Sequence, residues 1–142
     1  MKVGIHYHTD KYPEFTAKIE KHGNFYDLST AERVELYEGD TGKISLGVSI
    51  NLPDGYYATL LPRSSTFGKY GIMVANSMGI IDSSYRGMND IWKLVVYATR
   101  HITIPANTRI AQFTIVKENE FEVIEEEWEA PDRGGFGSSD TK

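Results

Sequence analysis

The sequence predicts an all-β domain, built as a sandwich or a barrel, and two features carry that prediction. Short runs rich in β-branched and aromatic residues recur along the chain, whereas helical periodicity is scarce. Between the runs lie clusters of Gly, Pro, Asn and Asp, the residues that favour turns. Short strands separated by turns in this way are typical of sandwiches and barrels.

Taken in order along the chain, the runs expected to form strands are residues 3–7, 43–50, 56–61, 91–98, 109–116 and 121–124. Turns are expected at residues 38–40, 52–55 and 104–107, where Gly or Pro stands beside Asp, Glu or Asn. One short helix is expected at residues 64–69, because Ser64 and Ser65 offer side-chain oxygens that can cap its first turn.

Length and composition indicate one domain. A chain of 142 residues can bury a sizeable core, and 40% hydrophobic with 25% charged residues is the balance of an ordinary globular protein. We expect this single β domain to cover residues 1–130.

The C-terminal segment, residues 131–142, differs from the rest. It holds Arg133 and Phe136 among three glycines and offers almost nothing to a core. Ordering backbone costs about 1–2 kcal/mol per residue, and glycine loses the most freedom. We therefore expect a mobile segment with the composition of a lid that closes over a ligand, although a plain flexible terminus has the same composition.

Charge and cysteine content exclude several classes. The net charge of −5 and the absence of a basic block argue against nucleic acid as a partner, so an anionic ligand must be met by a few placed cations. Without cysteine there is no disulfide framework, thiolate nucleophile or Cys-based zinc site. No apolar run reaches the length of a signal peptide or a membrane span, so we expect a cytoplasmic protein that makes no membrane contact.

Two segments hold residues that suit a nucleotide. Residues 62–66 place Arg63 and hydroxyl side chains where the helix is expected to begin, a favourable position for phosphate. In residues 74–87, the Asn76 amide can read a pyrimidine edge and Asp82 follows a strand-like run. Each segment alone also has an ordinary structural explanation: a helix cap with a surface arginine, a turn held by Asp82, and Tyr85 packed in the core.

Five strings in order along the chain resemble the motifs of the dUTPase family. The most informative is the third, residues 79–87, with the sequence GIIDSSYRG. The others are residues 25–28 (FYDL), 62–65 (PRSS), 109–113 (RIAQF) and 133–138 (RGGFGS). Together they extend over residues 25–138, nearly the whole chain. The pattern is closer to phage and Gram-positive members of the family than to enteric ones.

The resemblance implies a distorted jelly-roll (β-clip) sandwich with one short helix. It also implies a homotrimer whose sites lie at subunit boundaries, each completed by the tail of a neighbour. The implied reaction is Mg²⁺-dependent hydrolysis of dUTP to dUMP and pyrophosphate, which keeps uracil out of DNA and supplies dUMP for dTMP synthesis.

The match to the third motif implies the residues around the nucleoside and the reacting water. Asp82 would be the general base for a water that attacks the α-phosphorus. Asn76 would pair with uracil, assisted by the backbone of Gly79, Ile80 and Ile81. Tyr85 would pack under the deoxyribose and exclude a 2′-hydroxyl.

The other motifs imply the phosphate and metal contacts. Arg63, Ser64, Ser65 and Gln112 would hold the phosphates. In the tail, Arg133 and Ser138 would clasp the terminal phosphate while Phe136 stacks on uracil, and Gly137 would also contact the substrate. Mg²⁺ would be held mainly by the triphosphate and water, with no direct protein ligand and with Asp27 reaching it through water.

Two other functions remain open at this point. A dCTP deaminase shares the fold and some of the phosphate contacts, but it would release ammonia. A phage-type regulatory protein would use the assembly to engage a protein partner.

Overall fold

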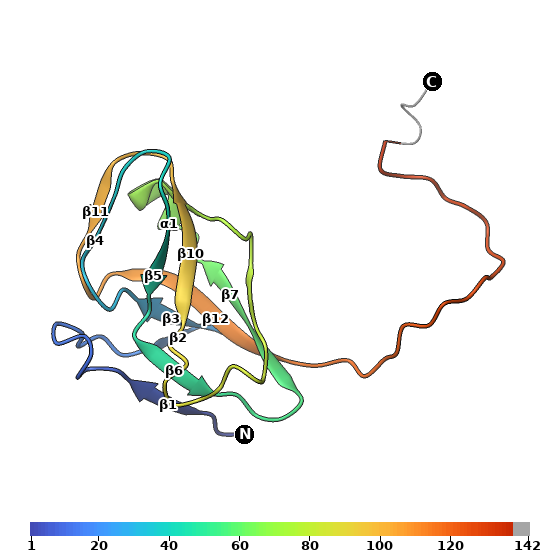
Figure 1. Ribbon diagram of the computed structural model, residues 1–142, viewed down its shortest axis with the longest axis horizontal. Helices are drawn as coiled ribbons and strands as arrows, with labels where there is room; N and C mark the ends of the chain where they lie inside the picture. The colour runs from blue at the N-terminus through green and yellow to red at the C-terminus, as the bar shows by residue number, and fades with distance from the viewer. Residues whose placement is uncertain (138–142) are drawn as a thin grey trace.

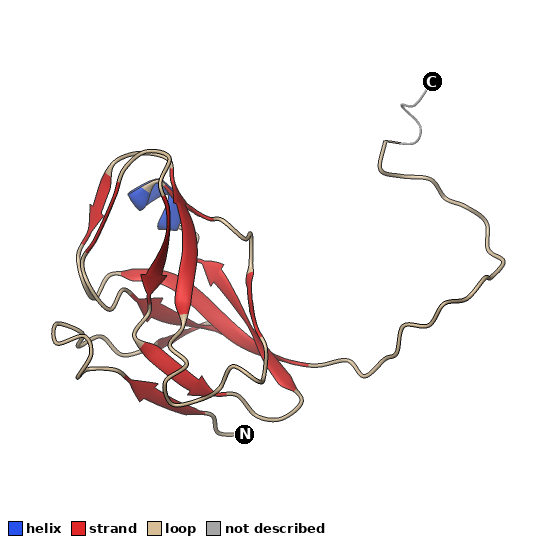
Figure 2. Ribbon diagram, in the orientation of Figure 1, coloured by secondary structure: helices blue, strands red, loops and turns tan. Residues whose placement is uncertain are grey.

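The structure is a computed structural model that describes residues 1–137. Over that part of the chain it contains strands and one short helix (Figures 1 and 2). The elements are, in order, β1 (Gly4–Tyr7), β2 (Glu20–His22), β3 (Phe25–Ser29), β4 (Val34–Leu36), β5 (Thr41–Ser45), β6 (Val48–Asn51), β7 (Tyr56–Pro62), α1 (Thr66–Tyr70), β8 (Ile72–Val74), β9 (Gly79–Ile81), β10 (Lys93–Ala98), β11 (Ile102–Ile104) and β12 (Arg109–Lys117). The predicted all-β class is confirmed.

The strands pair antiparallel in four sheets. The largest has the order β2-β3-β12-β7-β9, and a second has the order β5-β10-β8. The pairs β1-β6 and β4-β11 complete the set. The long strand β12 lies in the middle of the largest sheet, so it fixes the register of β3 on one side and β7 on the other.

One expected strand, residues 43–50, is two strands with a bend between them. Gly47 has a φ of 69°, and a Cβ there would lie 2.5 Å from the Phe15 ring. The bend sends β5 to pair with β10 and β6 to pair with β1. Only glycine combines that backbone conformation with so close an approach.

The short helix is present but begins later than expected. It spans Thr66–Tyr70, and the N-cap Ser65 makes no side-chain capping hydrogen bond. Thr66 fixes the start instead, because its Oγ1 accepts from the backbone N–H of Arg63 at 2.9 Å and donates to the carbonyl of Ile110 at 2.9 Å. The beginning of the helix is thereby tied to β12.

The prediction of a strand at residues 121–124 is wrong. β12 ends at Lys117, and the described residues 118–137 contain neither helix nor strand. Figure 1 shows this segment, in orange and red, running away from the β domain. Its apolar side chains are exposed, with Phe121 at 79% and Val123 at 84%, because the segment has no neighbouring strand to pair with.

The core lies between the sheets and centres on Trp92. This side chain is fully buried, and its ring meets that of Phe113 edge-on at 5.1 Å between centroids. Leu28, Ile44 and Ile110 are buried in the same cluster. Within residues 1–137 no helix has the length and apolarity needed to cross a bilayer.

Candidate active site

Asp82 lies immediately after β9, at an edge of the largest sheet, and its side chain is exposed. The hydroxyl of Ser84 donates a hydrogen bond to Asp82 Oδ2, and the backbone N–H of Ser84 donates to the same oxygen at 2.9 Å. These two bonds, the hydroxyl first, hold the pKa of the Asp82 carboxyl below its ordinary value. Asp82 is therefore an ionised, water-accessible carboxylate at neutral pH.

A hollow of about 500 Å³ opens beside Asp82 and is lined in part by Ile80, Ile81 and Tyr85. Tyr85 is 42% exposed, so the explanation that it packs in the core is wrong. Its hydroxyl donates to the carbonyl of Ile91 at 3.0 Å, which ties one end of the side chain to the wall. The ring is thus fixed at the hollow, in reach of a ligand.

Asn76 lies in the tight turn between β8 and β9, and it is exposed. The turn is closed by the N–H of Met78, which donates to the Asn76 carbonyl at 2.7 Å, and Ser77 has a φ of 63°. Gly79 then packs against β7, where a Cβ would lie 3.1 Å from Leu60. The turn leads directly into β9 and so connects Asn76 with the segment that carries Ile80, Ile81 and Asp82.

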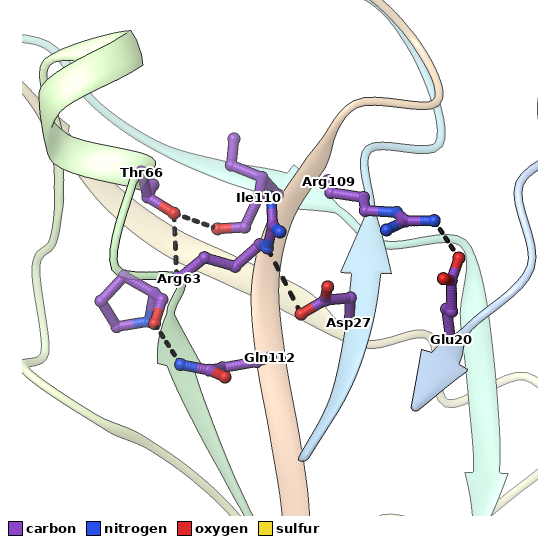
Figure 3. Close-up of polar contacts among 8 residues, drawn as sticks. Glu20, Asp27, Arg63, Thr66, Arg109, Ile110 and Gln112 are labelled. Atoms are coloured by element: carbon purple, nitrogen blue, oxygen red, sulfur yellow. Dashed lines mark hydrogen bonds and ion pairs between the residues drawn. The ribbon is translucent and has the colours of Figure 1, made fainter. Parts of the chain in front are cut away.

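Asp27, Arg63 and Gln112 form a second group of expected site residues (Figure 3). The register places Asp27 directly opposite Gln112, and Gln112 opposite Leu61, two residues before Arg63. Asp27 is buried, with Oδ1 3.3 Å from Arg63 Nε. The Gln112 amide donates to the carbonyl of Pro62 at 3.0 Å, so it also braces the loop that carries Arg63.

The contact between Asp27 and Arg63 constrains what each can do. Asp27 is only 3% exposed, which leaves little surface for a metal-bound water, whereas Arg63 is 25% exposed. Because the contact uses Nε, the two terminal nitrogens of the Arg63 guanidinium can still donate to phosphate. Ser64, next along, is exposed, and Ser65 is partly exposed at the start of α1.

The tail residues lie apart from both groups. Arg133, Phe136 and Gly137 are exposed, and Figure 1 shows their segment far from the β domain. Ser138 lies outside the described residues. The structure therefore does not bring the fifth motif to the rest of the site within one chain.

Asp82 and Arg63 line two different hollows, and Val74 and Ser77, which lie on either side of Asn76, line the one that holds Arg63. Arg63 and Ser64 line a hollow of about 510 Å³ together with Phe67. None of its lining residues is among those of the hollow beside Asp82.

Two residues of this surface were not predicted from the sequence. Ser84 stands two positions after Asp82, the spacing at which an Asp side chain bonds the backbone in a turn, so it could have been found. Arg109 is the other: it pairs with Glu20 beside Asp27 (Figure 3), a contact that depends on the bulge near the start of β12 and has no local signal.

The structure is thus an all-β domain with an ionised, exposed carboxylate beside a hollow of about 500 Å³. The sequence profile described as dUTPase matches residues 18–141. This chain belongs to the dUTPase family, the deoxyuridine 5′-triphosphate nucleotidohydrolases, as its motifs predicted. A prophage-derived member from Bacillus subtilis, YosS, is 40% identical over 144 residues, which cover 100% of each chain. A member from Hahella chejuensis is 40% identical over 118 residues, covering 79% of this chain and 76% of its own.

Solved structures confirm the jelly-roll fold. The dUTPase from Streptococcus mutans has a TM-score of 0.72 and 24% identity, covering 84% of this chain and 99% of that one. The dUTPase of Staphylococcus bacteriophage 80alpha, solved with dUPNHPP, has a TM-score of 0.76 and 22% identity over 97% and 98% of the two chains. A variant of the phage phi11 enzyme of S. aureus, solved to describe the coordination of a structural Mg(II) ion, has a TM-score of 0.76 and 19% identity over 90% and 98%. The expected likeness to phage-type members is confirmed by these structures and by YosS.

The donor groups of the chain can be tested against Mg²⁺. Residues 1–137 contain no group of three or more His, Asp or Glu side chains placed to hold a metal ion. Mg²⁺ keeps several waters and is commonly held by substrate phosphates with one or two carboxylates. Binding of Mg²⁺ in that way stays a prediction for this chain.

Proposed function

We propose that this chain hydrolyses dUTP to dUMP and pyrophosphate, with Asp82 as the general base. The observation that carries the proposal is the placement of an ionised, exposed Asp82 at the mouth of a hollow, in a chain of the dUTPase family. A general base must be ionised at the working pH and open to the water it deprotonates, which the lowered pKa and the exposure of Asp82 support.

In the proposed reaction, Asp82 takes a proton from water while the water oxygen forms a bond to the α-phosphorus. The bond between the α-phosphorus and the oxygen that bridges to the β-phosphate breaks, and pyrophosphate leaves with that oxygen. Ser84 occupies Oδ2 of Asp82, so Oδ1 is the oxygen left to accept the proton. Bound Mg²⁺ would supply neutralising charge to the triphosphate.

Specificity is proposed to come from the turn and the ring beside it. Asn76 and the backbone of Gly79, Ile80 and Ile81 would pair with uracil, since the turn is narrow and Asn76 is exposed at its tip. Tyr85, held by its bond to Ile91, would lie under the deoxyribose where a 2′-hydroxyl has no room. The phosphates would be held by Arg63, Ser64, Ser65 and Gln112, with Asp27 fixing Arg63.

We also propose a homotrimer with sites shared between chains. A single substrate must reach both the Asp82 hollow and Arg63, yet the two hollows share no lining residue within one chain. Large apolar side chains are exposed near the second hollow, as an interface requires: Phe67 and Met73 line it, and Tyr97 stands opposite Met73 on β10. With a chain mass of 16.0 kDa, light scattering should give about three times that value.

The tail, residues 131–142, is proposed to be a lid that closes on a neighbouring site. Stacking of Phe136 on uracil is worth about 1–3 kcal/mol, too little by itself to order a glycine-rich segment. Contacts of Arg133, Gly137 and Ser138 with the terminal phosphate must supply the rest. Closure should therefore need a triphosphate.

Limited proteolysis tests the lid. Cleavage after Arg133 should slow strongly with a non-hydrolysable dUTP analogue and little with dUMP, at concentrations that saturate both. Equal protection by the two ligands would contradict the role of the terminal phosphate.

Ser84→Ala tests the control of the Asp82 carboxyl. Removing the hydroxyl bond raises the pKa of Asp82 toward its ordinary value, because the ionised form loses a donor. On acidification, activity that requires ionised Asp82 should then be lost at a higher pH than in wild type, so the acid limb of the kcat/KM profile shifts to higher pH. At neutral pH Asp82 stays ionised in the variant, so the rate there should change little. Ser84→Thr, which keeps a hydroxyl, should restore the wild-type limb, and an unchanged limb in Ser84→Ala would contradict the bond's effect.

A nucleotide panel tests the function itself. The protein is incubated with Mg²⁺ and each deoxynucleoside triphosphate, with UTP included, and both pyrophosphate and ammonia are measured. We expect pyrophosphate from dUTP alone and no ammonia. Ammonia from dCTP would favour the deaminase, and no turnover of any nucleotide would favour a binding role.

Cytoplasmic location and a regulatory protein partner stay predictions. The lack of cysteine agrees with a reducing compartment. Phage dUTPases among the similar structures are described as controlling the transfer of virulence genes, but at 20–22% identity they share the fold alone.

A further inference from the structure

The hollow beside Asp82 is also lined by two cations, Lys43 and Lys93. They come from β5 and β10, which lie side by side (Figure 1). The register pairs Lys43 with Val95, and Lys93 lies two residues before Val95 on the same strand. Since side chains two apart on a strand share a face, both lysines project from one face of the sheet as diagonal neighbours.

Within residues 1–137 neither lysine has a carboxylate as an ion-pair partner, and both are exposed. Arg63, Arg86 and Arg109 are each paired with a carboxylate, whereas no lysine in residues 1–137 forms an ion pair. The chain carries 20 acidic against 15 basic residues, so carboxylates are not scarce. Two like charges on neighbouring strands repel each other, and an anion between them removes that cost.

Asp82 does not serve as that anion. Its Oδ2 is held by Ser84, and within the described part of the chain it forms no ion pair with either lysine. The hollow therefore combines one carboxylate and two ammonium groups with the apolar side chains of Ile81 and Val95. A ligand with an apolar body and one anionic group close to the carboxylate matches this distribution.

We propose that Lys43 and Lys93 bind the phosphate nearest Asp82, which in the proposed reaction is the α-phosphate. The inference rests on the proposed function for the identity of the ligand and adds two residues to the site. Arg133 is assigned to the terminal phosphate, which dUMP lacks, whereas the lysine pair would meet both dUTP and the product dUMP. The pair would also offset the charge that Asp82 brings close to an anionic substrate.

Binding of dUMP and of deoxyuridine tests the proposal without turnover. Calorimetry or NMR titration is carried out on wild type, Lys43→Gln, Lys93→Gln and the double variant. Lys117→Gln is the matched control, since it removes the same charge at the exposed end of β12 and lines neither hollow. Each lysine change should weaken dUMP binding about 3- to 10-fold, the range expected of a charged contact that stays partly solvated. Deoxyuridine, which has no phosphate, should bind all variants equally.

Two further measurements complete the test. The dependence of dUMP affinity on ionic strength should flatten in the double variant, and Lys93→Arg should keep wild-type affinity. The proposal is overturned if the Lys43 and Lys93 variants lose no more affinity for dUMP than Lys117→Gln does. It is also overturned if they lose as much affinity for deoxyuridine as for dUMP. Because binding is measured directly, a wild type that binds dUMP but fails to hydrolyse dUTP would refute the proposed function and leave the role of the lysines to be judged separately.

Discussion

Asp82→Asn should reduce kcat for dUTP by about 10²–10⁴-fold, the range over which a positioned general base contributes. The amide keeps the shape of the side chain and can still accept from the Ser84 N–H through its carbonyl oxygen, but it cannot take a proton from water. Pyrophosphate release under saturating dUTP and Mg²⁺ is the measurement. KM, or the affinity for a non-hydrolysable analogue, should change little, because the lost interaction belongs to the transition state.

The matched control is Asp10→Asn, which neutralises another exposed carboxylate that lines neither the Asp82 hollow nor the one beside Arg63. It should keep wild-type kcat. Retention of more than about a tenth of the wild-type rate by Asp82→Asn, with folding and analogue affinity intact, would remove Asp82 from the role of base.

Trp92→Ala should lower the free energy of unfolding by about 3–5 kcal/mol, the cost found when a fully buried aromatic side chain is truncated. Trp92 is 0% exposed and its ring packs edge-on against Phe113. For a chain of this length the loss corresponds to a fall in Tm of roughly 10–17 °C. Thermal and denaturant unfolding, both at one fixed protein concentration, measure it.

Trp128→Ala removes the same side chain from a position that is 76% exposed. It should change stability by no more than about 0.5 kcal/mol, as most surface substitutions do. Equal losses in the two variants would mean that the burial of Trp92 does not determine stability. A loss in Trp128→Ala that grows as the protein is diluted would instead show that the C-terminal segment packs against another chain.

The elements that could be predicted are those whose pattern is local. Residues 3–7, 56–61, 91–98 and 109–116 correspond to β1, β7, β10 and β12, and the three expected turns lie between strands. β2 was missed because its sequence, EKH, is entirely polar and exposed, and it exists only by pairing with β3. At residues 121–124 the prediction failed for the opposite reason. Their composition suits a strand, but within the described chain no strand lies beside them.

In the candidate site too, features with a local sequence pattern could be predicted and features that depend on strand pairing could not. The third motif could be read from sequence because Asp82 and Tyr85 are close along the chain and line one hollow, and Asn76 precedes them in the turn that leads into β9. The burial of Asp27 against Arg63 could not, because it depends on the register of β3, β12 and β7. Nor could Lys43 be placed in the same hollow as Asp82, since that requires the pairing of β5 with β10.

The bend at Gly47 has a consequence for misassembly. On either side of it, a series of apolar side chains is buried at every second position, namely Ile44, Leu46, Val48, Ile50 and Leu52. Left straight, that series would form one long apolar strand with little charge, the kind of segment that stacks into cross-β aggregates. In the folded chain the segment is divided into two strands, and β5 pairs with β10 while β6 pairs with β1. It therefore does not present one long apolar strand edge. Opening of β1 away from β6 would free one edge of that segment, so changes that weaken the pairing of the N-terminal strand should favour aggregation.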